Sequence, residues 1–148
     1  MKKPILSSLA VCSVMLIGLP ACNRAEAPST VSADVADAQK DRAENVLDAQ
    51  KDQAETYSDT ATAAASRDPD NRGDAIEDRA EARFDTAVAQ AKGDMDVAKQ
   101  GCEALKGDAQ SQCKKSADAA YESAKSTAQL ALETERKRSD ATQKLDNK

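Results

Sequence analysis

The chain has 148 residues, which is enough for one domain behind a leader. It contains no His or Trp, two Tyr, one Phe and five Gly, and its hydrophobic content of 40% is mostly alanine. The net charge is −5, and acidic and basic residues are interleaved at short spacing, as on a solvated helix surface. So few large apolar side chains cannot fill a wide core, whereas Ala, Lys, Glu and Gln favour helix. The composition therefore predicts long, thin helices and disfavours a globular enzyme, and the lack of a basic patch with aromatic residues disfavours nucleic-acid binding.

A signal peptide is predicted over residues 1–21. Two lysines follow Met1, and the apolar stretch over residues 5–18 is shorter than the roughly 20 residues that a transmembrane helix needs. Leu-Pro-Ala-Cys follows at residues 19–22 and resembles the lipobox of bacterial lipoproteins. The resemblance implies cleavage before Cys22, transfer of diacylglycerol to its thiol, and acylation, for example with palmitate, of the amine that cleavage frees. Several acyl chains hold a protein durably on a membrane, since each buried methylene contributes about 0.8 kcal/mol.

The residues around Cys22 indicate the destination of the mature protein. By the sorting rule of enteric-type bacteria, Asn23 sends such a lipoprotein to the outer membrane, facing the periplasm. Residues 22–31 lack apolar periodicity and are predicted to form the lipidated N-terminus and a flexible tether. Two alternatives stay open: ordinary cleavage after residues 25–27 (Ala-Glu-Ala), which the following Pro28 disfavours, or a plain Cys22 thiol behind an uncleaved anchor.

Three long helices are predicted within the helical domain, residues 32–148. Ser and Thr residues between 29 and 32 offer N-caps for the first helix, which is expected to run over about 32–66. The helix breakers in Asp68–Gly73 (Asp-Pro-Asp-Asn-Arg-Gly) then predict a turn.

Capping signals bound the other two helices. Asp74–Glu77 has the D-x-x-E form of a capping box, which predicts a second helix over about 75–105. Gly107 suits the C′ position after that helix, and Asp108 is placed to cap a third helix over about 109–144. The similar lengths and short loops predict an all-α fold, either an elongated antiparallel helical hairpin or an up-down-up three-helix bundle of long Ala-rich helices.

Heptad spacing predicts a coiled-coil seam between the second and third helices. The second helix carries side chains at alternating intervals of four and three, at Phe84, Val88, Ala91, Met95, Ala98, Cys102 and Leu105. The third helix has a matching series at Cys113, Ala117, Ala120, Ala124, Ala128 and Ala131. Folding the chain back at the intervening turn sets Cys102 opposite Cys113. Because each of the other five facing pairs contains at least one Ala, we expect the two helices to pack closely.

The first helix contains an 11-residue repeat. Asp-Ala-Gln-Lys-Asp at residues 37–41 recurs at residues 48–52, and Val35, Val46 and Tyr57 take equivalent positions. Eleven residues make three turns at about 3.67 residues per turn, so these three side chains share one face without left-handed supercoiling. The helix is expected to dock on the hairpin, to pair with another protomer or to be partly formed. The repeat also resembles that of late-embryogenesis-abundant proteins, which implies an alternative role as a stress-protectant amphipathic helical protein.

Cys102 and Cys113 are the two thiols that remain once Cys12 leaves with the signal peptide and Cys22 is lipidated. An even pair in an oxidising compartment, placed face to face by the helix register, predicts a disulfide. A redox-active pair is the alternative, but such pairs usually stand closer in sequence, as in C-x-x-C. Zinc binding has less support, because two thiols without His fall short of four ligands.

Two further resemblances concern the end of the chain. Residues 98–113 carry a C-x-x-L-x-G-x-A-x-x-x-C pattern that resembles small exported Ala/Lys-rich helical proteins of proteobacteria. This similarity covers residues 92–125 and implies a cross-linked helical hairpin, but no activity. The last residue, Lys148, is similar to the C-terminal Lys of the major murein lipoprotein, which implies attachment of its side chain to peptidoglycan.

The sequence lacks a catalytic constellation, since it has no His base, no G-x-S-x-G elbow and no Gly-rich phosphate loop. Neighbouring acids such as Asp94 and Asp96 are expected to face solvent. We therefore expect a non-enzymatic cell-envelope lipoprotein with a structural, scaffolding or protein-binding role, without a cofactor or a metal. Its expected partners are the membrane, through the lipid anchor, and an envelope protein or peptidoglycan, but no nucleic acid.

Overall fold

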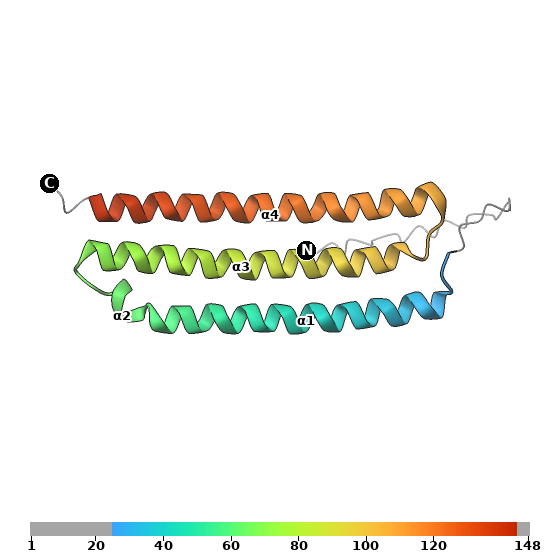
Figure 1. Cartoon of the computed structure of the whole chain (residues 1–148), viewed down its shortest axis with the longest axis horizontal. Helices are drawn as coiled ribbons and strands as arrows, with labels where there is room; N and C mark the ends of the chain where they lie inside the picture. The colour runs from blue at the N-terminus through green and yellow to red at the C-terminus, as the bar shows by residue number, and fades with distance from the viewer. Residues whose placement is uncertain (1–24, 145–148) are drawn as a thin grey trace, which may run out of the picture.

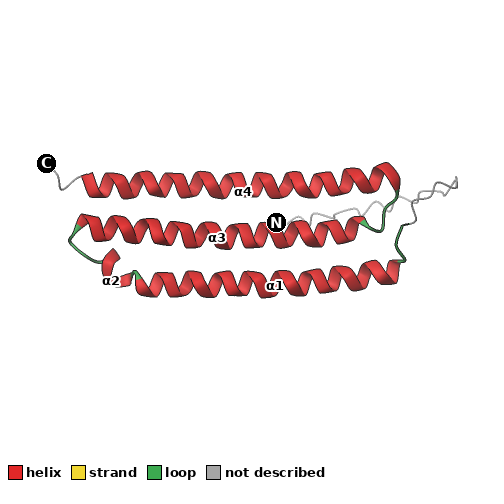
Figure 2. Ribbon diagram, in the orientation of Figure 1, coloured by secondary structure: helices red, strands yellow, loops and turns green. Residues whose placement is uncertain are grey.

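The computed structural model describes residues 25–144, and this part of the chain is all-α, as predicted. Its four helices are α1 (Pro28–Asp59), α2 (Ala61–Ala64), α3 (Pro69–Cys102) and α4 (Gly107–Lys144). Helix α3 runs antiparallel to both α1 and α4, and the short α2 lies in the connection between α1 and α3 (Figures 1 and 2). At 1.5 Å per residue, each long helix is about 48–57 Å in length.

The long helices form one flat layer with α3 in the middle (Figure 1). Within residues 25–144, α3 contacts both α1 and α4, whereas no Cα atom of α1 lies within 8 Å of a Cα atom of α4. The arrangement is therefore the predicted hairpin of α3 and α4 with α1 docked on its α3 side. A triangular three-helix bundle would bring α1 and α4 into contact, whereas the flat layer keeps them apart.

The flat layer follows from two seams on α3. One seam faces α4 and includes Ala91, which lines the same small cavity as Ala117. The other faces α1 and includes Gly93, where an added Cβ would collide with the side chain of Arg42. Two residues correspond to about 200° around a helix, so positions two residues apart, such as Ala91 and Gly93, lie on opposite sides of α3. The helices that pack on these seams must lie on opposite sides of α3 as well.

Small residues dominate the buried positions of the layer. The buried residues of the long helices are Val31, Gly73, Ala75, Ala80, Ala91, Gly93, Cys102, Ala117, Leu132 and Ser139. Several alanines of the predicted seam, namely Ala98, Ala120, Ala124 and Ala131, are exposed. The predicted close packing therefore occurs at a few points along the helices, and the interior is one side chain thick.

The first helix starts and ends earlier than predicted. It begins at Pro28, inside the segment expected to be a tether, because the fixed φ of proline suits the first helical position. It ends at Asp59 instead of continuing to residue 66, and Thr60 separates it from α2. The Thr60 hydroxyl donates to the carbonyl of Thr56 at 2.7 Å and accepts from Nε of Arg79 at 2.7 Å.

The predicted start of the second helix was wrong. Residues 69–73 are not a turn but the first turns of α3, and Asp74–Glu77 lies inside the helix instead of capping it. The N-cap is Asp68, whose side chain accepts a hydrogen bond from the backbone N–H of Asp70 at 3.0 Å, and Pro69 takes the first helical position. Asp and Pro break a helix in its interior, but both favour its first turn.

The turn between α3 and α4 is longer than predicted. Helix α3 ends at Cys102, with Glu103 at the C-cap, so Leu105 lies in the turn and is exposed instead of continuing the seam. Gly107 opens α4 and does not close α3, and α4 therefore starts before Asp108. Gly107 has a φ of 57°, in the left-handed region that glycine adopts without strain.

The helices of residues 25–144 do not include a segment with both the length and the apolar character needed to cross a membrane.

Candidate functional site

The predicted site residues fall into two groups. Cys22, the lipobox around it, the signal peptide before it and Lys148 lie outside the described residues. Cys102 and Cys113 lie within them, at the end of the layer where α3 turns into α4. We call this the clasped end, and we call the opposite end, where α3 begins and α4 finishes, the far end.

The structure brings the two predicted cysteines together as a disulfide. Their Cα atoms lie 5.7 Å apart, Cys102 is 0% exposed, and Cys113 is half-buried. Reactive disulfides are usually accessible, so the complete burial of Cys102 favours a structural role over a redox-active one. Among residues 25–144, His, Cys, Asp and Glu side chains nowhere gather in groups of three or more that could hold a metal ion.

Polar contacts surround the disulfide and join both arms of the hairpin. Glu103 accepts a hydrogen bond from the Gln110 side chain at 2.5 Å and forms an ion pair with Lys114. One turn further from the bend, Lys99 pairs with Asp118 at 2.5 Å. These contacts hold α4 in the register that the disulfide also requires.

The N-terminal end of α1 is fixed at the clasped end as well. The backbone N–H of Glu26 donates to the backbone carbonyl of Glu103 at 3.2 Å. Glu26 is four residues after Cys22, so the predicted lipidation site precedes a segment that is tied to the disulfide-bonded turn.

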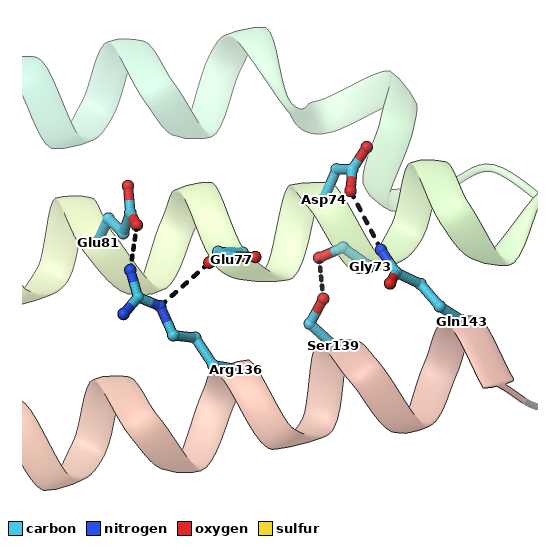
Figure 3. A network of polar contacts seen from close by, with 7 residues as sticks. All are labelled: Gly73, Asp74, Glu77, Glu81, Arg136, Ser139 and Gln143. Atoms are coloured by element: carbon cyan, nitrogen blue, oxygen red, sulfur yellow. Dashed lines mark hydrogen bonds and ion pairs between the residues drawn. The ribbon is translucent and has the colours of Figure 1, made fainter.

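A second polar network holds α3 and α4 together at the far end (Figure 3). The Arg136 guanidinium spans two carboxylates of α3, those of Glu77 at 3.0 Å and Glu81 at 2.6 Å. The Ser139 hydroxyl, which is 2% exposed, donates to the carbonyl of Gly73 at 2.8 Å. A hydrogen bond to Glu81 is the largest cause that raises the pKa of Arg136, and the carboxylate of Glu77 adds to it. The sequence pattern did not predict this network.

Several polar contacts join α1 and α3. Arg42 pairs with Asp94 at 2.6 Å, so Asp94 is not merely solvated, as was expected, but joins the two helices. Near the middle of the layer, the Thr86 hydroxyl lies 3.2 Å from the carbonyl of Ala49. Asp96 pairs with Lys92 one turn earlier on the same helix, where it is solvent-accessible.

The fold and this site define a class of protein: an all-α, single-layer antiparallel structure with one end closed by a disulfide. Compared with models of known protein families, with curated proteins and with solved structures, the chain matches none.

Proposed function

We propose that this chain is a non-enzymatic lipoprotein of the bacterial cell envelope, held through Cys22 in the outer membrane, and that it acts as a spacer or scaffold in the periplasm. The observation that carries the proposal is the arrangement of its two ends. Glu26, four residues after Cys22 in the sequence, is hydrogen-bonded at the clasped end, and the last turn of α4 lies at the far end (Figure 1). A molecule tethered at one end would therefore present the other about 55 Å away, at 1.5 Å per helical residue.

The shape of the layer supports a role without catalysis. Substrate pockets usually enclose most of a small ligand between converging walls. A layer that is one helix thick, with a seam of small side chains, offers open grooves between helices in place of such walls. A spacer needs only length and stiffness. The long helices provide the length, and the disulfide and the two polar networks contribute to the stiffness.

A second, more specific role is favoured by the position of the α4 C-terminus. Lys148 follows α4 by four residues, so a covalent link from its side chain to peptidoglycan would leave the far end at the cell wall and the clasped end at the membrane. Digestion of the cell wall with a muramidase tests this role. Release of the protein only after digestion supports it, and full extraction by detergent alone contradicts it.

The intact mass of the protein extracted from membranes tests the main proposal. We expect a chain that begins at Cys22 and carries diacylglycerol and a further acyl chain, with a gain of two hydrogen atoms when a reductant opens the Cys102–Cys113 bond. A Cys22→Ser variant is the matched control and should lack the acyl mass. A mature chain without acyl groups, or one that begins elsewhere, would overturn the anchor.

A further inference from the structure

In the half of the layer nearer the far end, the two faces of α3 border grooves of opposite charge. On α3, Arg79 and Arg83 alternate with Glu81 and Asp85 at intervals of two residues. Two residues correspond to about 200°, so the arginines and the acids leave the helix on opposite sides. The acidic side has a groove of about 440 Å³ between α1 and α3, whose charged lining residues are Asp52, Asp59, Asp78, Glu81 and Asp85.

The arginines line a different groove near the far end, which we call the arginine groove. It has a volume of about 360 Å³ and crosses the layer from α1 over α3 to α4. Its charged lining residues are Arg72, Arg79, Arg83, Arg138 and Glu135. Four cations therefore stand against one acid, although the whole chain has 26 acidic and 21 basic residues.

One of the four arginines is held rigidly by the protein. Nε of Arg79 donates to the Thr60 hydroxyl at 2.7 Å, and a terminal nitrogen donates to the carbonyl of Tyr57 at 3.2 Å. Its guanidinium lies 4.9 Å from the centre of the Tyr57 ring. These neutral partners fix the position of the charge without neutralising it.

The other three arginines are largely free to bind. Arg138 pairs only loosely with Glu135, at 3.6 Å, and its side chain is mostly exposed. Within residues 25–144, neither Arg72 nor Arg83 forms an ion pair. Gathering like charges costs free energy through mutual repulsion, and a bound anion removes that cost.

We propose that the arginine groove binds the carboxylate groups of peptidoglycan. The planar guanidinium fork matches a carboxylate with two parallel hydrogen bonds, and several carboxylates recur along each peptide-bearing glycan strand. The inference rests on the proposed anchoring and deepens it by naming the partner. Tyr57 is 29 residues along α1 from Pro28, so the groove lies about 45 Å from the anchored end and away from the headgroups of that membrane.

Co-sedimentation of the detergent-extracted full-length protein with isolated peptidoglycan sacculi tests this site. The groove variant is Arg72→Gln with Arg83→Gln, because both side chains are exposed and pair with no acid of the described chain. The control is Lys51→Gln with Lys115→Gln, which removes the same charge from exposed positions elsewhere. Loss of two charge-assisted contacts should weaken binding by about tenfold or more in the groove variant, because both arginines are exposed and their contacts are partly screened by solvent. The control should bind within about twofold of the unaltered protein, because distant surface charges are screened.

Chemical modification of the sacculi tests the ligand. Sacculi whose carboxylates have been converted to neutral amides should no longer retain the unaltered protein. Circular dichroism of both double variants should match that of the unaltered protein, so that a loss of binding reports on the groove and not on folding.

Three outcomes would overturn the inference. The first is an equal loss of binding in the groove variant and the control, and the second is undiminished binding to amidated sacculi. The third is binding that depends on Arg72 and Arg83 but occurs only on vesicles of phosphatidylglycerol. The intact mass reports on anchoring separately, so an acylated protein with no groove-dependent binding would contradict only the inference, and a non-acylated protein with it would contradict only the anchor.

Discussion

The two sides of α3 are built from different interactions. Toward α4, the interface contains a disulfide, the buried Leu132 and small residues such as Ala91 and Ala117. Toward α1, it contains the Arg42–Asp94 ion pair and hydroxyl and guanidinium contacts, and no covalent bond within the described residues. Exposed ion pairs contribute little to stability, whereas a disulfide and a buried Leu each contribute several times more. The comparison teaches that α3 and α4 form the stable half of the layer and that α1 is held on it more weakly.

The largest effect on stability is expected when the disulfide between α3 and α4 is removed. Replacing Cys102→Ser together with Cys113→Ser should lower the free energy of unfolding by about 3 kcal/mol, because the unfolded chain regains the entropy of a 12-residue loop. Urea denaturation followed by circular dichroism measures the loss. The unaltered protein in excess reductant should lose the same amount, and an unchanged midpoint in both samples would show that the hairpin does not depend on the bond.

A pair of neighbouring leucines tests the buried part of the same interface. Leu132 is 6% exposed and Leu130 is 63% exposed, two residues apart on α4. Leu132→Ala should cost about 2 kcal/mol, at the lower end for a buried Leu because the layer is thin. Leu130→Ala should stay within about 0.5 kcal/mol of the unaltered protein. Equal effects of the two substitutions on the urea midpoint would show that burial of Leu132 between α3 and α4 does not stabilise the protein.

Two glycines of α3 test how closely α1 packs on this helix. A Cβ at Gly93 would lie 2.8 Å from the Cβ of Arg42, whereas a Cβ at Gly101 would meet nothing within 4 Å. Gly93→Ala should cost about 1 kcal/mol despite the better helix propensity of Ala, because α1 must shift away. Gly101→Ala should instead gain up to about 1 kcal/mol. Hydrogen exchange should show that Gly93→Ala speeds exchange in α1 and leaves α4 unchanged; faster exchange in α4 would contradict the comparison.

The smallest effect is expected for a single hydroxyl at the far end. Ser139→Ala removes the buried hydrogen bond to the carbonyl of Gly73 and should cost about 1 kcal/mol or less, because that carbonyl belongs to a helix that already uses it. The exposed Ser126 on the same helix is the control, and Ser126→Ala should be neutral or slightly stabilising. A larger loss for Ser126→Ala than for Ser139→Ala in thermal unfolding would contradict this assignment.

The sequence predicted one side of α3 and missed the other for a physical reason. The seam toward α4 contains Phe84, Ala91 and Met95, whose heptad spacing is visible as an apolar pattern. The seam toward α1 contains Arg79, Thr86 and Gly93, which an apolar pattern cannot reveal because one residue is charged, one is polar and one has no side chain. The flat arrangement of the layer depends on that second seam, so it could not be predicted.

The polar network at the far end could have been predicted from the register that pairs Cys102 with Cys113. Folding the chain so that Cys102 faces Cys113 also sets Arg136 opposite residue 79, between Glu77 and Glu81, and the structure has both ion pairs. The boundaries at Asp68 and Pro69 were missed because residues that break a helix interior also begin one, and the sequence pattern alone does not separate the two cases.

The placement of the two ends has a mechanical consequence. Tension applied between residue 25 and Lys144 would pull α1 past α3 and α3 past α4, parallel to the helix axes, instead of peeling one helix from the next. In such sliding, all the contacts along an interface bear the load at the same time. The disulfide adds a covalent limit to how far α4 can slip along α3, so the molecule is built to resist stretching along its length.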